Sequence, residues 1–371
     1  MIVGVGLVVT GAVPGFLAAS LAPRIRGDFA FGESALGIAA AVFYIVSMIG
    51  SPALARLVER VGAERGMQLC AAATFTACLG IVGLAQSALS LTALLALAGV
   101  GNALASPAVS LMLRAEVPDA QHGLAFGAQQ AGAPIGSLLA GLALPAVAIP
   151  FGWRWGYLAA ALLAVALVAA APPSTGGPGR ANVSERVRGL GVVHVLGLVA
   201  FLASAAGVGF ISFLVTYSVD NGIDEGAAGL LLAAVSLCAA TARIVLGLRA
   251  DRGGQEALRP LAAMFLISTL GYGLLIAGEP AAIVVAALLA GSFGWAWPGA
   301  LNLAVVQRSP GAPAWAVGVM MTGLFAGAIA GPVAIGVLAD HDLWTPAWLM
   351  CAVFALLAAA TVVAVRRHES A

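Results

Sequence analysis

The sequence has no lysine and few charges of any kind. All 17 basic residues are arginines, and charged residues make up only 9% of the 371-residue chain. A soluble domain normally carries about 25% charged residues, so this composition argues against a soluble protein. The net charge of +1 comes without a clustered basic face, which argues against binding to nucleic acid.

The four cysteines lie in apolar runs without the spacing of zinc ligands. We therefore expect no disulfide, no metal site and no cofactor. The chain also has no HExxH motif and no nucleophile elbow, and its glycine patterns at 4–9 and 99–104 lie in apolar segments with no preceding strand. These absences predict that the protein is not an enzyme.

Long apolar runs dominate what is present. Hydrophobic residues make up 61% of the chain, and its mean hydropathy is +1.04. Because about 20 apolar residues cross a bilayer, the sequence predicts an all-α membrane protein with twelve transmembrane helices. The expected spans cover residues 1–22, 35–57, 67–85, 88–112, 123–145, 153–171, 191–218, 227–249, 260–278, 281–306, 313–338 and 345–365.

One long polar stretch, "PPSTGGPGRANVSERVRG" at 172–189, divides the chain almost in half. Its proline, glycine and serine content is typical of a linker. We therefore expect a six-helix half over 1–171, a cytoplasmic linker over 172–190 and a second six-helix half over 191–371. One such chain would hold a complete pathway, so a monomer suffices.

The arginines predict the orientation. With both termini cytoplasmic, thirteen arginines fall inside, and only Arg24, Arg26 and Arg154 fall outside. This bias is the one that the positive-inside rule requires. The arginine-only composition, rich in alanine and glycine, is typical of GC-rich bacterial genomes. We therefore expect a multi-pass protein of the cytoplasmic membrane, with the lipid bilayer as its solvent.

The two halves show internal similarity. A shift of 191 residues brings Pro107 onto Pro298, and a shift of 192 brings "LVERVG" at 57–62 onto "RADRGG" at 249–254. The first shift also brings Gly127, Gly132 and Gly136 onto Gly318, Gly323 and Gly327. Each match pairs one span with the span six positions later, which predicts two tandem halves in parallel orientation.

These features resemble the major facilitator superfamily over essentially the whole chain. Its loop signature is a glycine, then Asp-Arg, one residue, Gly and basic residues; "GLRADRGG" at 247–254 fits it well, whereas "ARLVERVGAER" at 55–65 has Ala55 for the glycine and Glu59 for the aspartate. The resemblance implies that this motif links helix ends across the halves and favours the outward-open state. Simple positive-inside anchoring is the alternative. The motif residues are Glu59, Arg60, Gly62, Gly247, Asp251, Arg252 and Gly254.

The resemblance also implies a central cavity lined by spans 1, 4, 7 and 10. Polar and aromatic residues near it are candidate ligands for a small-molecule substrate, although helix packing, bonds to the helix's own backbone or an aromatic belt would also explain them. Span 10 is expected to bend at Pro298. The candidates beside Arg243 are Asn102, Gln130, Tyr44, Tyr217, Trp295, Trp297 and Asn302, and Pro134, Gly136, Gly331 and Pro332 are expected to bend or pack helices.

Arg243 is the strongest signal, because an arginine near a helix centre costs about 2.5–3.5 kcal/mol on insertion scales. Snorkelling toward Arg249 is one explanation, but helical side chains lean toward their own N-terminus, which here points to the bilayer centre. An acidic partner is another, but every acid lies at the end of a span. A substrate carboxylate is the third, since a guanidinium fork binds it bidentately.

The segment "ATARIVLG" at 240–247 is also similar to the span 8 arginine region of monocarboxylate and oxalate/formate carriers, where the arginine is implied to hold the carboxylate. The aspartate that monocarboxylate carriers have one turn earlier is Ala239 here. The sequence thus predicts a secondary transporter of a small organic solute, with an anion as the expected class.

Two alternatives stay open. One is export of hydrophobic compounds by a pocket of Phe210, Phe293, Trp295 and Trp297, with Arg243 structural. The other is a membrane-embedded receptor without flux. Coupling to protons or to exchange is also open, because no span has a carboxylate at mid-depth.

Overall fold

The computed structural model describes residues 2–29, 32–117, 122–169, 190–251, 258–309 and 313–370, and all regular structure within these ranges is helical. The helices of the first half are α1 Ile2–Ser20, α2 Ala22–Phe29, α3 Glu33–Val61, α4 Ala63–Leu84, α5 Ala88–Glu116, α6 His122–Gln130, α7 Gly132–Ala143, a π-helix Leu144–Ala148, α8 Ile149–Phe151 and α9 Trp153–Ala169. Those of the second half are α10 Leu190–Asp220, α11 Glu225–Asp251, α12 Leu258–Leu275, α13 Pro280–Gly294, α14 Pro298–Arg308, α15 Pro313–Ala339 and α16 Trp344–Ser370.

Ten spans in the described ranges are long and apolar enough to cross a membrane. An eleventh consists of α1 and α2 together, which meet at an angle of 63°. The sixth expected span coincides with α9, which at 17 residues is shorter than the others. The tenth expected span is interrupted at the position where a bend was expected, because α13 ends at Gly294 and α14 begins at Pro298.

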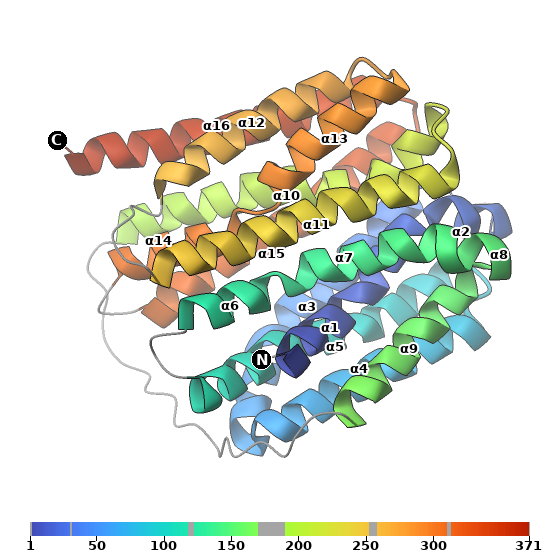
Figure 1. Cartoon of the computed structure of the whole chain (residues 1–371), viewed down its shortest axis with the longest axis horizontal. Coiled ribbons are helices and arrows are strands. Elements are labelled where there is room, and N and C mark those ends of the chain that lie inside the picture. Colours follow the sequence, from blue (N-terminus) through green and yellow to red (C-terminus); the bar gives the residue numbers. More distant parts are fainter. Residues whose placement is uncertain are drawn as a thin grey trace.

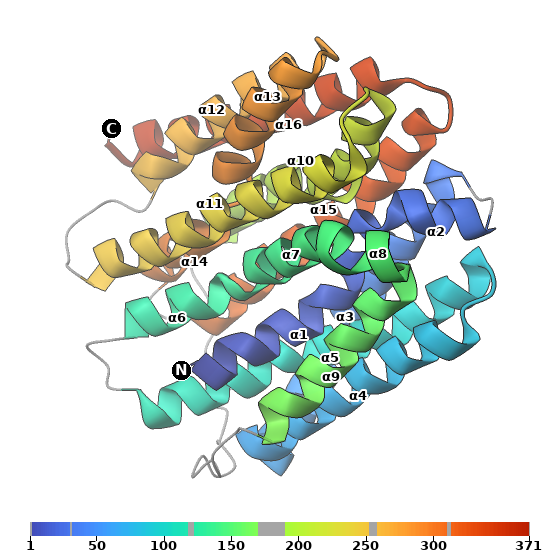
Figure 2. The same ribbon diagram turned by 45° about the vertical axis from the view of Figure 1, so that its right-hand side comes forward.

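The long helices lie side by side in one bundle, with the first-half helices along one side and the second-half helices along the other (Figures 1 and 2). The halves meet mainly where α11 packs on α6 and α7, α15 packs on α3, and α10 packs on α1. We call the end with Glu33, Asp220 and Asp340 the acidic end. We call the opposite end, where α3 and α11 finish, the linker end.

The hydrophobic core is shared at the acidic end and divided at the linker end. The shared cluster contains Phe16 and Leu36 of the first half together with Phe213 and Trp348 of the second. Toward the linker end the first half has its own cluster around Met67 and the second half has another around Phe265. The buried core is therefore continuous at the acidic end and divided between the halves toward the linker end, and we call this division the fork.

Direct contacts close the acidic end. Arg24 of α2 forms an ion pair with Glu225 of α11, with 2.7 Å between Nε and Oε2. A Cβ built on Gly37 of α3 would lie 2.4 Å from the carbonyl oxygen of Pro332 on α15. Further toward the linker end on α15, a Cβ on Gly318 would meet no atom within 4 Å. The α3–α15 contact is thus tight at the acidic end.

The α6–α7 and α11 helices contact each other in antiparallel order over their whole length. Near the linker end a Cβ on Gly127 would lie 3.1 Å from Cα of Gly247, and near the acidic end a Cβ on Gly141 would lie 2.6 Å from the oxygen of Gly229. Between them, Ser236 donates a 3.0 Å hydrogen bond to Ser137. This pair keeps the halves together beside the fork.

Within the second half, α15 lies directly against the backbone of α10. Built Cβ atoms on Gly323, Gly327 and Gly331 would lie 2.1–2.2 Å from carbonyl oxygens of α10. Only glycine permits such an approach, because any side chain would force the two helices apart.

Candidate functional site

Arg243 on α11 has two backbone carbonyls as hydrogen-bond partners. Its Nε donates to the Trp295 oxygen at 3.1 Å, its Nη2 donates to the same oxygen, and its Nη1 donates to the Gln130 oxygen at 2.5 Å. The residue is 5% exposed. Among the described residues no carboxylate lies within ion-pair distance of it. The partner that the sequence left open is therefore main-chain oxygen.

Both carbonyls lie where a helix is interrupted. Gln130 is the last residue of α6, and Trp295 directly follows α13. A helix C-terminus has carbonyls without donors from a following turn and carries the equivalent of about half a negative charge. The two carbonyl dipoles therefore stabilise the guanidinium without cancelling its formal charge. This arrangement explains how the bundle holds a buried guanidinium without an acid.

The ring of Trp295 contacts both halves. It meets the ring of Phe16 on α1 edge-on, with 5.4 Å between centroids. The guanidinium carbon of Arg243 lies 5.4 Å from the Trp295 centroid, within the range of a cation–π interaction. Arg243, Trp295 and Gln130 thus form one contiguous group that joins α1, α6, α11 and the α13–α14 break.

Asn102 on α5 bonds to the neighbouring helix α3. Its Nδ2 donates to Oγ of Ser47 at 3.0 Å. The Ser47 hydroxyl is itself bonded to carbonyls of Phe43 and Gly99. In this structure Asn102 therefore has the interhelical role that the sequence analysis left open beside a ligand role.

Gln129, beside the predicted Gln130, links α6 to α5. Its amide nitrogen donates to the Ser106 carbonyl at 3.1 Å and to Oγ of Ser110 at 3.0 Å. Asn102, Ser106 and Ser110 lie four residues apart and so share one face of α5. Ser106, between the two bonded residues, is exposed.

Two of the predicted aromatic ligands lie away from Arg243. Trp297 is 1% exposed in the core of the second half, where its ring packs against Phe265. Tyr217 lies near the acidic end, where its hydroxyl donates to the Leu275 carbonyl at 2.6 Å and its ring packs on Trp344. The structure does not bring these two residues to the Arg243 group.

The remaining two candidates are half-buried. Tyr44 on α3 packs edge-on against Phe43, with 5.1 Å between centroids. Asn302 lies on α14, two helical turns from Trp295 toward the linker end, and its buried Oδ1 has no hydrogen-bond partner. Asn302 therefore retains an acceptor that a ligand donor could use.

The first copy of the loop motif connects α3 to α4. Gly62 has a φ of 92° and its N–H donates to the Val58 carbonyl at 2.8 Å, which permits the sharp turn between the helices. Glu59 is half-buried and Arg60 exposed. In the part of the chain that the structure describes, neither has a hydrogen bond or ion pair with the other half.

In the second copy, Gly247 contributes the close α6–α11 contact described above. Arg252 and Gly254 lie outside the described residues, as does the side chain of Asp251. The gating role of this motif stays a prediction.

The predicted packing residues all lie at helix contacts. Pro134 and Gly136 are buried on α7, and a Cβ on Gly136 would lie 3.4 Å from Val13 and from the Val9 oxygen on α1. Gly331 lies against α10 and the carbonyl of Pro332 against α3. These positions hold α7 to α1 and α15 to its two neighbours.

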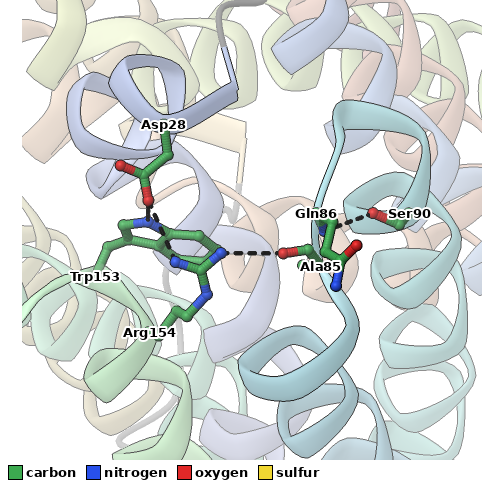
Figure 3. Close-up of polar contacts among 6 residues, drawn as sticks. All are labelled: Asp28, Ala85, Gln86, Ser90, Trp153 and Arg154. Atoms are coloured by element: carbon green, nitrogen blue, oxygen red, sulfur yellow. Dashed lines mark hydrogen bonds and ion pairs between the residues drawn. The ribbon is translucent and has the colours of Figure 1, made fainter.

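Arg154 joins three segments of the first half at the acidic end (Figure 3). It donates to Asp28 at 3.2 Å and to the Ala85 carbonyl at 3.1 Å, where it satisfies the end of α4. Its guanidinium lies 4.4 Å from the Trp153 ring centroid, and the indole N–H of Trp153 donates to Asp28 at 2.7 Å. This cluster fixes α2 against α9 and the α4 end.

Comparison with solved structures shows the same fold in known transporters. The chain superposes on a D-xylose-proton symporter with a TM-score of 0.75 and 16% identity, covering 97% of this chain and 96% of that one. It superposes on the nucleoside transporter NupG with a TM-score of 0.77 and 14% identity, covering 98% of both chains. The human organic anion transporter MFSD10 (TETRAN) gives a TM-score of 0.70 and 15% identity, with 97% of this chain and 99% of that chain covered.

Among curated proteins no sequence match is found. The family model of the Major Facilitator Superfamily matches residues 3–192 and 196–371, which is nearly the whole chain. The all-helical fold, its apolar spans and this match lead to one conclusion: the chain is a multi-pass membrane protein that belongs to the Major Facilitator Superfamily.

Proposed function

We propose that this protein carries a small organic anion, with a carboxylate as its recognised group, across the membrane by alternating access. Arg243 is the cationic ligand of the substrate. Gln130 and Trp295 surround it, and Asn302 offers a further polar contact. One observation carries the proposal: a full positive charge is buried in the bundle with carbonyls, but no carboxylate, as its partners.

Electrostatics support an anion. Among the described residues only Arg243 and Glu33 are charged and buried, and Glu33 at the acidic end is paired with Arg26. Carbonyl dipoles solvate the guanidinium but leave its formal charge uncancelled. In a region of low dielectric constant this charge attracts an anion much more strongly than it would in water.

The geometry supports access to Arg243. A guanidinium has five N–H donors, and three of those in Arg243 are bonded to carbonyls in this state, so a carboxylate can bind the two others or displace a carbonyl from a bonded one. Arg243 also lies where the shared core divides, between Ala239 of the shared cluster and Leu246, which packs on the second-half cluster. We therefore place the route of the solute to Arg243 at the linker end, where the buried core is divided between the halves.

The structure gives less support to export of hydrophobic compounds. The aromatic residues required for that pocket are dispersed: Phe210 packs against Tyr272 and Trp348, Trp297 packs against Phe265, and Phe293 is 36% exposed. Of the four aromatic residues required for that pocket, only Trp295 has a ring contact with Arg243 among the described residues. A shared aromatic pocket is therefore not assembled in this state.

Further features of the proposal follow from the sequence. The two halves are residues 1–171 and 191–371 with the linker 172–190 between them, and both termini and the linker end are cytoplasmic in the cytoplasmic membrane. The monomer is the working unit. Energy comes from protons or from exchange with a second solute.

Thermal stabilisation of the purified protein by carboxylates tests the proposal, because a ligand that binds only the folded state raises its stability. The panel contains formate, acetate, benzoate, oxalate and succinate, with methyl benzoate as an uncharged control. We expect carboxylates to raise the melting temperature of the wild type. Arg243→Lys keeps the positive charge but loses the bidentate guanidinium. This variant should therefore need at least tenfold more carboxylate for the same rise in melting temperature.

Flux of the stabilising anion into proteoliposomes then separates a carrier from a receptor without transport. Equal stabilisation by benzoate and methyl benzoate, or equal responses of wild type and Arg243→Lys, would refute the anion assignment. Binding without flux would support the receptor alternative.

A further inference from the structure

Pro134 leaves the Gln130 carbonyl free to accept a hydrogen bond from Arg243. In a helix each N–H donates to the carbonyl four residues earlier, and residue 134 lies four residues after Gln130. Proline has no N–H, so this carbonyl has no donor from its own helix. The neighbouring bonds are intact, since Ala131 N–H donates to Gly127 and Ile135 N–H to Ala131, each at 3.0 Å. The Gln130 carbonyl therefore lies at the break between α6 and α7, with bonded turns on either side of it.

The resulting bond crosses between the halves. Gln130 belongs to the first half, whereas Arg243 and its other acceptor, Trp295, belong to the second. The cross-half hydrogen bond of Ser137 and Ser236 and the ion pair of Arg24 lie closer to the acidic end. The Arg243–Gln130 bond lies further toward the linker end than either of these two links.

We infer that Pro134 is a positioning residue for transport. It leaves the Gln130 carbonyl without a helical donor, so that this neutral carbonyl binds Nη1 of Arg243 in the empty carrier. The substrate carboxylate then replaces the Gln130 carbonyl at Nη1. The inference rests on the proposed function for the identity of the replacing group. An anion that takes Nη1 releases the first half from Arg243, so binding lowers the stability of the state seen here and becomes linked to the switch between states.

The inference fixes the direction of a mutational effect. Any other residue at 134 supplies an N–H to the Gln130 carbonyl and weakens that carbonyl as an acceptor for Arg243. The anion then displaces a weaker competitor, so affinity should rise rather than fall. Loss of the cross-half bond should also lower the population of the state seen here.

Isothermal titration with benzoate measures the first effect. Pro134→Ala and Pro134→Ser should both bind benzoate about tenfold more tightly than the wild type, because the restored N–H is common to both. Pro107→Ala is the matched control: it also removes an in-span proline, but the carbonyl four residues earlier accepts no side-chain donor in the described structure. Its affinity should be unchanged. Unchanged or weaker benzoate binding by both Pro134 variants would overturn the inference.

Spin labels measure the second effect without ligand. Leu57→Cys on α3 and Thr322→Cys on α15 are exposed and lie on opposite halves near the linker end. The labels are placed in a background without native cysteines, and pulsed dipolar spectroscopy measures the distance between them. In both Pro134 variants, the fraction of molecules in which the halves are apart at the linker end should fall several-fold. In Pro107→Ala this fraction should not change.

The two measurements separate the failure modes. If no carboxylate binds the wild type, the proposed function fails, while the label distances still decide whether Pro134 controls the cross-half bond. If the label distances of the Pro134 variants match those of the wild type, the inference fails whatever the ligand proves to be.

Discussion

The closed acidic end rests on contacts that a single methyl group should disrupt. Gly37 on α3 faces the backbone of Pro332 on α15, and these helices belong to different halves. Gly37→Ala therefore adds volume only where the halves meet. Because alanine also favours a helix more than glycine does, the first half itself should not be destabilised.

The expected magnitude follows from the distances. The new Cβ would lie 2.4 Å from the Pro332 oxygen, whereas ordinary contact begins at 3.4 Å, so about 1.0 Å of separation is required. The three nearest atoms belong to the backbone of Pro332 and Val333, which cannot rotate away as a side chain would. Overpacking of this kind costs about 1–3 kcal/mol. Applied to one state only, that cost shifts the ratio of states by about 5- to 150-fold.

Spin labels at the acidic end report this shift. Gly27→Cys on α2 and Val337→Cys on α15 are exposed, and a Cβ at Gly27 meets no atom within 4 Å. We expect the short-distance population to fall in Gly37→Ala. Gly318→Ala is the matched control on α15, because its added Cβ also meets nothing within 4 Å.

Two outcomes would refute this reasoning. If Gly37→Ala keeps the short distance at full population, the α3–α15 contact does not hold the acidic end closed. If it unfolds at a much lower temperature without any change in the label distance, the contact contributes to the fold and not to the choice of state.

Three further predictions concern contacts outside the Arg243 group. Partial burial raises the pKa of Asp340, but hydrogen bonds from the Ser34 hydroxyl and from the backbone of Ser34 and Glu33 outweigh it, and the net pKa lies below the usual value. Asp340→Ala should therefore weaken the closure of the acidic end by about 1 kcal/mol at pH 7. In the wild type, the contribution of Asp340 should disappear as the pH falls below about 4, where its carboxylate becomes protonated. Label distances measured from pH 7 to pH 3 check both expectations. Tyr217→Phe loses the bond to the Leu275 carbonyl and should unfold a few degrees earlier, by about 1 kcal/mol, with unchanged carboxylate affinity in titrations. Arg154→Gln loses the cation–π contact and the charge, and should lower thermal stability without altering flux per folded molecule.

The hydropathy of the chain predicted most of the fold. The spans are read from runs of apolar residues because every buried backbone group in lipid must be bonded within its own helix. One detail was not predictable in this way: the first expected span continues past a 63° bend into α2, whose polar composition carries no hydropathy signal. The sixth expected span, 153–171, begins where α9 begins, at Trp153, and α9 is described to Ala169.

The candidate site was predictable in its central residue but not in its partners. Arg243 stands out because charge is costly in an apolar span. Its partners are carbonyls, which every residue possesses, so a search for acidic side chains could not find them. The position of Pro134 four residues after Gln130 was the available signal, because it marks a carbonyl without a helical donor. Trp295 and Trp297 look equivalent in sequence, and only the break between α13 and α14 sends them to different surroundings.

The backbone contact between α10 and α15 gives the second half a mechanical property. Three contacts at four-residue intervals, from Gly323 to Gly331, prevent the two helices from sliding or rotating past each other. Two helices held together at several points resist bending more than either helix alone. Since α15 also packs on α3 at the acidic end, we expect α10 and α15 to tilt together as one rigid unit in the proposed alternating-access cycle.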